Sequence, residues 1–482
     1  MSVLTGLEPA LLWKYFDKIR QIPRSSGKEE AIADYVISVA KQFGLQFEKD
    51  KTGNVLIRKP ASPGHEKAKT VVLQSHLDMV CEKNSDKKFD FDKDPIQLKM
   101  DGEWLKADGT TLGADNGIGI ATALAILEDN KLVHGPIEAL FTIDEERGLV
   151  GAMSISPTWL KGRIMLNLDS EDLGLFSIGC AGGSDSHIKL PIKRIKASGN
   201  QQVEVHLSGL LGGHSGVNIH EGRGNALKII NRLIYQANKE IPLGIVCFEG
   251  GDKHNAIPRE AKVKIMIDSK KLAALKKWFT KTMEDIRIEF KPVEQAIGLT
   301  VNEIPGVEEV LAPDTQKTLL SLLFALPHGP LAMSRDIKNL VETSNNVASI
   351  RCEKEQIKIH CSSRSSNGAA LKATLDKIAA IAQLAGAALD QPPGYPGWMP
   401  NLESAILKVS LDTFKQVTGK EARYEAIHAG LECGLIGEKF SGMDMISLGP
   451  TIKYPHSPDE RVNVPSVNVF YQHTIKILET LA

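Results

Sequence analysis

The chain has 482 residues, which is enough for roughly two to four domains with a sizeable core. Its 58 basic and 59 acidic residues leave a formal net charge of −1, so no electrostatic footprint for nucleic acid or an anionic membrane is present. With 42% hydrophobic and 24% charged residues, the composition is ordinary for a soluble globular protein.

The amino-terminal segment and the cysteines predict a cytoplasmic protein. Residues 1–24 mix charged and apolar residues at helical spacing and lack the basic head and apolar core of a signal peptide, so we predict an amphipathic helix. No apolar run is long enough to cross a bilayer. The cysteines lack a CxxC motif, and such scattered thiols are typical of a reducing cytosol. They are Cys81, Cys180, Cys247, Cys352, Cys361 and Cys433.

Residues 1–60 predict two helices followed by a pair of strands. The apolar, β-branched segment from Lys69 to Val80 predicts a further strand that ends in His76 and Asp78. Because side chains two residues apart point to the same face of a strand, these two lie together. A histidine oriented by a neighbouring carboxylate suits a metal ligand. An ordinary structural histidine is the alternative.

A glycine-spaced loop within Asp108 to Asp129 places Asp115 at the start of a predicted helix of small and aliphatic residues. The glycines let the backbone approach another group closely, and the amino terminus of a helix favours an anion. Asp115 is therefore a candidate ligand, or it is a simple helix cap. A phosphate-binding loop is conceivable here, but the GxxxxGK[ST] signature is absent.

Three adjacent carboxylates, Asp144, Glu145 and Glu146, follow a strand-like run in the segment Phe141 to Ala152. Like charges at this spacing repel by roughly 1 kcal/mol per close pair in water, and by several times more when partly desolvated. A buried cluster of this kind needs a cation or a protonated member, whereas an exposed acidic turn does not. Neighbouring side chains on a strand face opposite ways, so Glu145 and Glu146 serve one site only where the strand breaks into a turn.

Another apolar strand, RIMLNLDSED, carries Asp169 at its end. Three strands interleaved with helical patterns thus finish in acidic or histidine residues, as in an α/β sheet whose strand ends form a site. His456 lies in the proline-containing segment KYPHSPDERVN near the carboxyl end. Taken alone, it is a surface histidine.

The pattern changes near residue 180, where CAGGSDSHIKLP predicts a hinge. The alternating strand that starts at Gln201 is typical of an antiparallel sheet with one solvated face. Further strands and helices follow, including a long helix predicted over Ala370 to Leu389, and they resemble two related α+β halves in tandem. The proline- and glycine-rich segment Gln391 to Asn401 predicts a linker that returns to the first domain.

We therefore predict one domain interrupted by another. The first domain comprises residues 1–185 and 395–482, and the inserted domain comprises residues 186–394.

The histidines and acids together predict a metal site. Imidazole and carboxylate ligands suit Zn²⁺, Co²⁺ or Mn²⁺. Five protein ligands are too many for one open catalytic zinc, but they fit two ions about 3.5–4 Å apart if one carboxylate bridges them. Glu145 is then left free to take a proton from water. The five candidate ligands are His76, Asp115, Glu146, Asp169 and His456.

The motifs HLDM, GADNGIGIA, FTIDEERGLVGA, NLDSED and HSPDE have the order and approximate spacing of the two-metal zinc peptidase clan of aminoacylases, carboxypeptidases and dipeptidases. The chain most closely resembles the aminoacyl-histidine dipeptidases, also called peptidase D or cytosol non-specific dipeptidases. The resemblance covers essentially the whole chain, including GLLGGHSGVNIHEGRGNA, HNAIPREA and HAGLECG. It implies a phosphorylase/hydrolase-like α/β catalytic domain, with a mixed sheet flanked by helices, that is interrupted by an inserted α+β lid domain.

The resemblance also implies the roles of the site residues. Glu145 is the general base that activates water, and Asp78 is catalytic because it orients the ring of His76. Asp115 bridges two divalent ions, which the resemblance implies are zinc, with cobalt or manganese as alternatives. The implied ligand sets are His76, Asp115 and Asp169 for one ion, and Asp115, Glu146 and His456 for the other.

The implied activity is hydrolysis of dipeptides with a free carboxylate, Xaa-His substrates such as carnosine above all. Four residues are candidates for substrate binding under the lid. His214 would donate to the developing oxyanion, Asn255 would contact the peptide, Arg364 would hold the substrate carboxylate, and Gly430 would let backbone approach the substrate. The alternatives are a turn histidine, an Asx turn, a surface arginine and a helix-adjacent glycine.

Two other functions fit parts of the pattern. An N-acyl-amino-acid deacylase would need the same metals and Arg364. In a non-enzymatic metal- or peptide-binding protein, Glu145 would have no role, which argues against this alternative. The resemblance suggests a homodimer formed through the lids, although a lid of this size could let one chain complete its own site.

Overall fold

The structure is a computed structural model that describes residues 3–306 and 309–482. The chain divides into two compact units. Unit one comprises Met1–Cys180, Trp398–Ala426 and Leu431–Ala482, and unit two comprises Ala181–Gly397 and Ile427–Gly430. The junctions thus lie a few residues from the predicted boundaries, and the segment Ile427–Gly430, which we expected in the first domain, belongs to unit two.

Over the described residues, unit one contains an eight-stranded mixed sheet in the order β1-β2-β6-β3-β7-β21-β8-β20. Its strands are β1 (Gln46–Lys49), β2 (Val55–Lys59), β3 (Val71–His76), β6 (Ile137–Thr142), β7 (Ile164–Asn167), β8 (Leu175–Cys180), β20 (Arg423–Ile427) and β21 (Asp444–Ser447). A smaller sheet contains β4 (Leu98–Asp101), β5 (Trp104–Ala107), β22 (Ile452–Lys453) and β23 (Arg461–Asn463).

Four neighbouring strands in the centre of the large sheet, β6, β3, β7 and β21, run parallel. All residues of β3 and β6 are buried and most are apolar, as expected for strands covered on both faces. Because parallel strands end at one edge of a sheet, the segments that follow β3, β6 and β7 start from the same edge. The register pairs His76 with Thr142 and Gln74 with Asn167, which aligns these three ends.

Helices cover the large sheet. The helix α3 packs against β3 and against α1, while α9 packs against β21 and α11. The helices of unit one are α1 (Ala10–Ile19), α2 (Glu30–Gln42), α3 (Ala114–Glu128), α4 (Val150–Ser154), α9 (Ala405–Thr418), α10 (Glu432–Lys439) and α11 (Val464–Leu481). The helix α1 lies within the predicted amino-terminal helix, of which residues 1 and 2 lie outside the described residues.

Over the same described residues, unit two contains a nine-stranded antiparallel sheet in the order β14-β11-β13-β12-β17-β18-β9-β19, with β16 paired to β17. Its strands are β9 (Gly182–Pro191), β11 (Gln201–Ser208), β12 (Gly244–Gly250), β13 (Ala261–Ile267), β14 (Gly298–Ile304), β16 (Gly329–Met333), β17 (Val341–Cys352), β18 (Gln356–Ser365) and β19 (Ala388–Asp390). The strands β10 (Arg194–Lys196) and β15 (Glu309–Leu311) form a separate pair.

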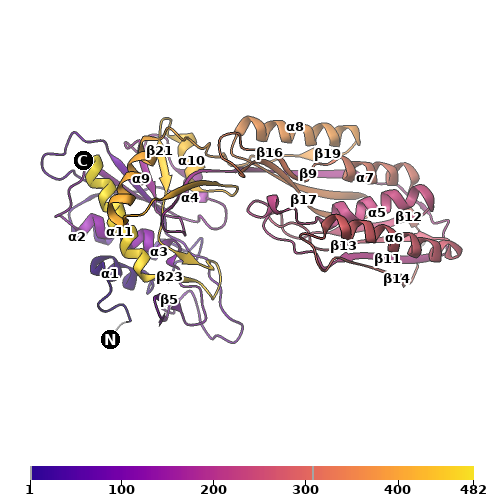
Figure 1. Cartoon of the computed structure of the whole chain (residues 1–482), viewed down its shortest axis with the longest axis horizontal. Helices are drawn as coiled ribbons and strands as arrows, with labels where there is room; N and C mark the ends of the chain where they lie inside the picture. Colours follow the sequence, from indigo (N-terminus) through magenta and orange to yellow (C-terminus); the bar gives the residue numbers. More distant parts are fainter. Residues whose placement is uncertain (1–2, 307–308) are drawn as a thin grey trace. The chain divides into compact units, whose positions relative to one another are not determined.

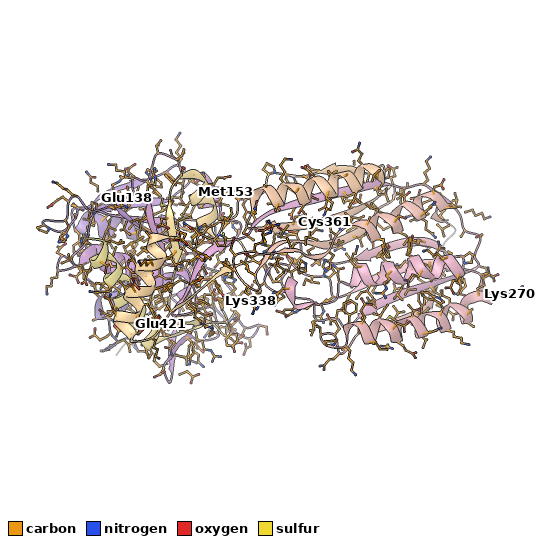
Figure 2. The ribbon with its side chains drawn as sticks, turned by 45° about the horizontal axis from the view of Figure 1, so that its top comes forward. Glu138, Met153, Lys270, Lys338, Cys361 and Glu421 are labelled. Atoms are coloured by element: carbon orange, nitrogen blue, oxygen red, sulfur yellow. The ribbon has the colours of Figure 1, made fainter. Side chains whose placement is uncertain are left out.

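Four helices of unit two lie side by side against its sheet in the order α6, α5, α7, α8 (Figure 1). They are α5 (Ala226–Glu240), α6 (Leu272–Phe290), α7 (Pro313–Ala325) and α8 (Gly368–Leu384), with the short 3₁₀ helices η1 (Ile219–Glu221) and η2 (Ser269–Lys271). Their apolar faces form one core with alternate residues of the strands, such as Ile188, Ile359 and Cys361. Cys361 lies inside the unit, whereas Lys270 extends into solvent (Figure 2).

Two predicted elements are wrong in detail. The predicted hinge over residues 180–191 is largely the strand β9, because alternate residues such as Ile188 and Leu190 pack into the core. The predicted helix to Leu389 ends earlier, at Leu384, since Gly386 has a φ of 64° and Ala388–Asp390 pairs with β9 as a strand. The two expected α+β halves contribute their strands to one continuous sheet.

Across the described residues, we find no helix with the length and apolar character needed to span a membrane.

Candidate metal centre and active site

The five predicted ligands come from separate segments of unit one and meet beyond the ends of its parallel strands. His76 is the last residue of β3, and Asp169 follows β7 by two residues. Asp115 precedes the regular part of α3 in an extended conformation (φ −79°, ψ 114°). Glu146 follows β6 within a turn, and His456 lies between β22 and β23.

Asp115 contacts both histidines, one through each carboxylate oxygen. Its Oδ1 lies 3.0 Å from Nε2 of His76, and its Oδ2 lies 3.1 Å from Nε2 of His456. Nε2 of His76 is also 3.3 Å from Oδ1 of Asp169, and Nε2 of His456 is 3.1 Å from Oε2 of Glu146. The geometry therefore defines two groups that share Asp115, each with one imidazole and two carboxylates.

Within each group the ligand atoms lie within 4.8 Å of one another. This donor set and spacing fit a divalent cation such as Zn²⁺. The groups are His76, Asp115 and Asp169, and Asp115, Glu146 and His456.

The electrostatics of the cluster also favour cations. Burial, reinforced by neighbouring carboxylates, raises the pKa of Glu145 well above its ordinary value. Burial likewise raises the pKa of Glu146 and of Asp169, and the surrounding carboxylates outweigh burial and raise the pKa of His76. In addition, Oε1 of Glu146 is buried and makes no hydrogen bond within the described chain. Positive charge placed among these groups would stabilise them in their ionised forms, so the residues fit the metal ions that the sequence predicts.

Asp78 is fully buried and contacts both His76 and the backbone of the acidic turn. Its Oδ1 accepts a hydrogen bond of 3.0 Å from the backbone N–H of Glu145 and lies 3.3 Å from Nδ1 of His76. Its Oδ2 accepts from the hydroxyl of Ser26 at 2.7 Å and from the backbone N–H of Glu146 at 3.2 Å. Burial opposes ionisation, but these donors lower the pKa of Asp78. Asp78 thus orients both the His76 ring and the acidic turn.

The acidic turn separates its three carboxylates. Asp144 adopts a positive φ of 51°, and its carboxylate pairs with Arg147 at 2.6 Å. The strand has ended at this point, so Glu145 and Glu146 need not face opposite ways. Both offer a carboxylate oxygen that, together with a His76 nitrogen, forms a third compact group within 4.8 Å. Glu145 therefore lies beside the two groups that share Asp115 without belonging to either.

Sequence reasoning missed several residues that support the site. Glu460 accepts hydrogen bonds from four successive backbone N–H groups, those of residues 112–115, at 2.7–3.3 Å, and so fixes the loop that carries Asp115. Glu432 accepts from Thr142 and Gln74, and burial raises its pKa to about 7. The side-chain amide of Asn116 donates to Asp169. Glu460 is the last residue of the family motif HSPDE, and this motif was the feature of the sequence that could have indicated its role.

The predicted substrate residues all lie in unit two, and three of them have informative surroundings. Arg364 is 7% exposed, its Nη1 donates to the hydroxyl of Tyr395 at 2.9 Å, and its Nε has no hydrogen-bond partner. Among the described residues it forms no ion pair with a carboxylate within 4.0 Å. A Cβ atom at Gly430 would lie 2.9 Å from the Tyr395 ring, so a larger residue there would require the ring to shift.

His214 is held in one tautomer by its own turn. Its Nδ1 accepts from the backbone N–H groups of Gly216 and Val217 at 3.2 and 3.0 Å, which assigns the ring proton to Nε2. Burial and the nearby Arg364 charge lower the pKa of His214 to about 4, so the ring is neutral near pH 7. Asn255 is exposed, and its backbone carbonyl accepts a hydrogen bond from the backbone N–H of Ser215 at 2.8 Å. None of these contacts involves a substrate, so the four substrate-binding roles stay predictions.

Comparison with known proteins identifies the family. The model of peptidase family M20/M25/M40 matches residues 72–480. The chain therefore belongs to this family. The predicted class of enzyme, a hydrolase of peptide bonds, and the predicted mixed α/β fold flanked by helices are confirmed.

The predicted resemblance to aminoacyl-histidine dipeptidases is confirmed as well. The chain is 41% identical over 483 residues to the cytosol non-specific dipeptidase of Escherichia coli (strain K12), covering 100% of this chain and 99% of the relative. It matches the crystal structure of an aminoacylhistidine dipeptidase from Vibrio alginolyticus with a TM-score of 0.93 and 43% identity, covering 99% and 98% of the two chains. The aminopeptidase PepT from Bacillus cereus ATCC 10987 shares the fold, with a TM-score of 0.57 and 15% identity over 98% and 99% of the chains.

Proposed function

We propose that this protein is a metal-dependent dipeptidase that cleaves dipeptides with a free carboxylate and prefers Xaa-His substrates such as carnosine. The observation that carries the proposal is Asp115, whose two oxygens each lie beside a different histidine, with Glu145 next to both groups. The relatives named as dipeptidases support this substrate class over the alternative of an N-acyl-amino-acid deacylase.

Two divalent ions would be held by the two groups that share Asp115. Zinc is the ion we propose, and cobalt or manganese would suit the same imidazole and carboxylate donors. When bound, such ions supply Lewis acidity, which polarises a carbonyl and lowers the pKa of water toward about 7.

Glu145 is the general base in this proposal. Its carboxylate takes a proton from the attacking water and returns it to the amine that leaves. Asp78 acts as a positioning residue, because it contacts the His76 ring and accepts the backbone N–H of Glu145.

The substrate would be recognised by unit two, which we propose as the lid. Arg364 is a buried cation without a carboxylate partner among the described residues, and a buried unpaired charge is costly. A substrate carboxylate would supply the missing anion. The neutral His214 has its ring proton on Nε2, where it can donate to the developing oxyanion. Asn255 would contact the peptide, and Gly430, which has no side chain and packs against the Tyr395 ring, would let backbone approach the substrate.

We also propose that the protein is cytoplasmic and forms a homodimer, with neither nucleic acid nor a membrane as a partner. The balanced charge and the name of the Escherichia coli relative support the location and partners. Sedimentation of the purified chain tests the oligomeric state.

Hydrolysis assays test the proposed function directly. Protein stripped with a chelator and then supplied with Zn²⁺, Co²⁺ or Mn²⁺ is assayed on Xaa-His dipeptides, other dipeptides and N-acetyl amino acids. We expect no activity after stripping, recovery with metal, and the highest kcat/KM on Xaa-His dipeptides. Preferential cleavage of N-acetyl amino acids would instead establish the deacylase, and no cleavage with any ion would establish a binding protein.

Replacing Arg364 tests the carboxylate contact. A charge-assisted hydrogen bond contributes about 1.5–3 kcal/mol, so Arg364→Ala should raise KM for a free-carboxylate dipeptide by about 10- to 100-fold. The same change should have little effect on a dipeptide amide, which lacks the carboxylate. Arg351→Ala is the matched control, because Arg351 lies in the same sheet with its side chain 44% exposed. Unchanged KM for the dipeptide would exclude Arg364 from this role.

A further inference from the structure

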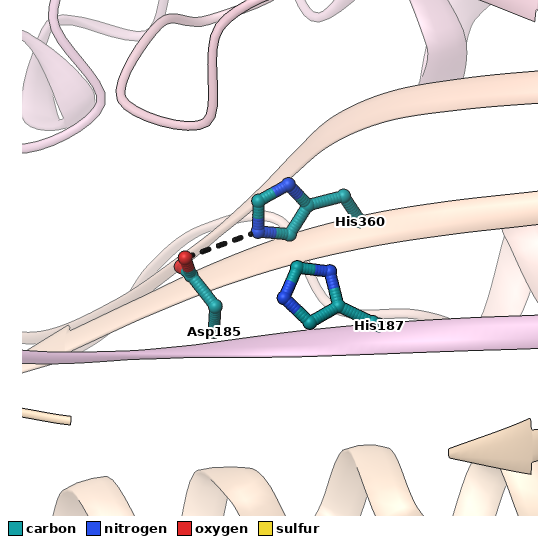
Figure 3. Close-up of side chains that lie close together, drawn as sticks. All are labelled: Asp185, His187 and His360. Carbon is teal, nitrogen blue, oxygen red and sulfur yellow. Dashed lines mark ion pairs between the residues drawn. The ribbon is translucent and has the colours of Figure 1, made fainter. Parts of the chain in front are cut away.

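Unit two contains a second cluster of histidine and carboxylate groups, formed by Asp185, His187 and His360 (Figure 3). Each side chain offers a ligand atom, and these atoms lie within 4.8 Å of one another. Oδ2 of Asp185 is 3.2 Å from Nε2 of His360, and the rings of His187 and His360 have centroids 4.4 Å apart. None of the three takes part in the proposed dipeptidase chemistry.

Strand register brings the three residues together. Asp185 and His187 are two residues apart on β9, so they share a face of the sheet. The antiparallel pairing with β18 places His360 directly opposite His187. The neighbours Ile188 and Ile359 point the other way, into the core beneath the helices. The cluster therefore lies on the face of the sheet that those helices do not cover, and its residues are half-buried.

The contacts within the cluster leave nitrogen atoms without hydrogen-bond partners. Nε2 of His360 is shielded from solvent. It forms an ion pair with Asp185 at 3.2 Å, but the two groups are not aligned for a hydrogen bond. Among the described residues, the ring of His187 contacts His360 and forms no hydrogen bond or ion pair. Two imidazoles and one carboxylate thus converge, and among the three the ion pair between Asp185 and His360 is the close polar contact.

We propose that Asp185, His187 and His360 form a binding site for a divalent transition-metal ion, separate from the pair of ions at the strand ends of unit one. Two imidazoles and one carboxylate are a common protein donor set for Zn²⁺. With metal–ligand distances of about 2.0–2.1 Å, tetrahedral ligands stand about 3.4 Å apart, close to the 3.2 Å between Asp185 and His360.

A third histidine lies at the edge of the site. Nδ1 of His254 is 3.8 Å from Oδ2 of Asp185, and its ring is stacked on that of His360 with centroids 6.1 Å apart. The His254 side chain is 57% exposed, so in the proposed site either its imidazole or a water molecule would complete the coordination of the ion. The site is thus a three-ligand site with one exchangeable position.

Counting bound zinc tests the proposal on the full-length protein. Chelator-stripped protein is dialysed against buffered Zn²⁺, and zinc per chain is measured by elemental analysis. We expect His187→Asn and His360→Asn each to bind one ion fewer per chain than the unsubstituted protein. The matched control is His206→Asn, because His206 pairs with Glu260 at 3.3 Å in the same sheet with similar exposure but without a third ligand. The control should bind the full number.

A second measurement needs no substitution. Diethyl pyrocarbonate modifies accessible histidines, and mass spectrometry reports the extent at each. Zn²⁺ should protect His187 and His360 and leave His206 unprotected. Equal zinc content in the variants and the control, or equal modification of His187 and His360 with and without Zn²⁺, would overturn the proposal. The unit-one ions are present in variants and control alike, so failure of the dipeptidase assignment would leave this difference unaffected.

Discussion

Glu145→Gln is expected to lower dipeptide turnover by about 10²–10⁴-fold and to leave the metal content of the protein unchanged. The substitution keeps the size of the side chain and removes its ability to accept a proton from water. Glu145 lies beside the two groups that share Asp115 but belongs to neither, so neither ion should lose a ligand. Turnover at saturating substrate and zinc per chain are the two measurements.

The neighbouring acids provide matched controls for this prediction. Glu146→Gln alters a carboxylate that lies 3.1 Å from His456, and it should lower both metal content and turnover. Asp144→Asn alters a carboxylate that pairs with Arg147, and it should change neither by a large factor. Retained turnover in Glu145→Gln would remove Glu145 from the role of base. Loss of zinc equal to that in Glu146→Gln would make it a ligand instead.

The positions of most candidate ligands could be predicted, because the strands that bring them together have a recognisable sequence pattern. Apolar β-branched runs predict buried parallel strands, and the polar residues at their ends then meet at one edge. His76, Glu146 and Asp169 follow this rule, since they end or follow β3, β6 and β7. His456 does not, because it lies in a loop between two short strands, and only the family motif indicated it.

The supporting contacts could not be predicted, because they join residues far apart in the chain through backbone groups. Glu460 binds four amides of a loop about 350 residues away, a contact that depends on how the two loops are placed. The cluster of Asp185, His187 and His360 depends on the register of β9 with β18. A shift of one residue would turn these side chains toward the other face, and spacing alone does not fix the register.

The boundaries of unit two illustrate the same limit. Glycines and small polar residues after Cys180 predict a hinge, yet Gly182–Pro191 is a ten-residue strand. The glycines are required there by close packing, because a side chain at Gly182 would come within 2.4 Å of the backbone of Gly397. A glycine-rich segment that packs against neighbouring backbone has the same composition as a flexible one, so composition did not distinguish them.

Asp78→Asn should reduce zinc affinity by about 10- to 100-fold and also lower turnover, although Asp78 belongs to neither of the two groups that share Asp115. The two oxygens of Asp78 face only donors, namely two backbone N–H groups, the Ser26 hydroxyl and Nδ1 of His76. An asparagine amide would direct its NH₂ group at one of these donors whichever way it turned. At least one buried donor then loses its partner, at a cost of about 1–3 kcal/mol in stability.

The effect on metal binding separates this role from simple packing. If Asp78 acts by orienting His76 and the turn of Glu145 and Glu146, saturating zinc should restore the metal content of Asp78→Asn but not its full turnover, because Glu145 stays displaced. Ser26→Ala is the control, since it removes one donor and leaves the carboxylate intact, so both values should stay within a few-fold of the unsubstituted protein. Zinc titration with a competing chelator gives the affinity, and turnover is measured at each zinc concentration. An Asp78→Asn protein with normal affinity and normal turnover would show that the buried carboxylate is dispensable, and would contradict the assignment of Asp78 as the residue that positions His76.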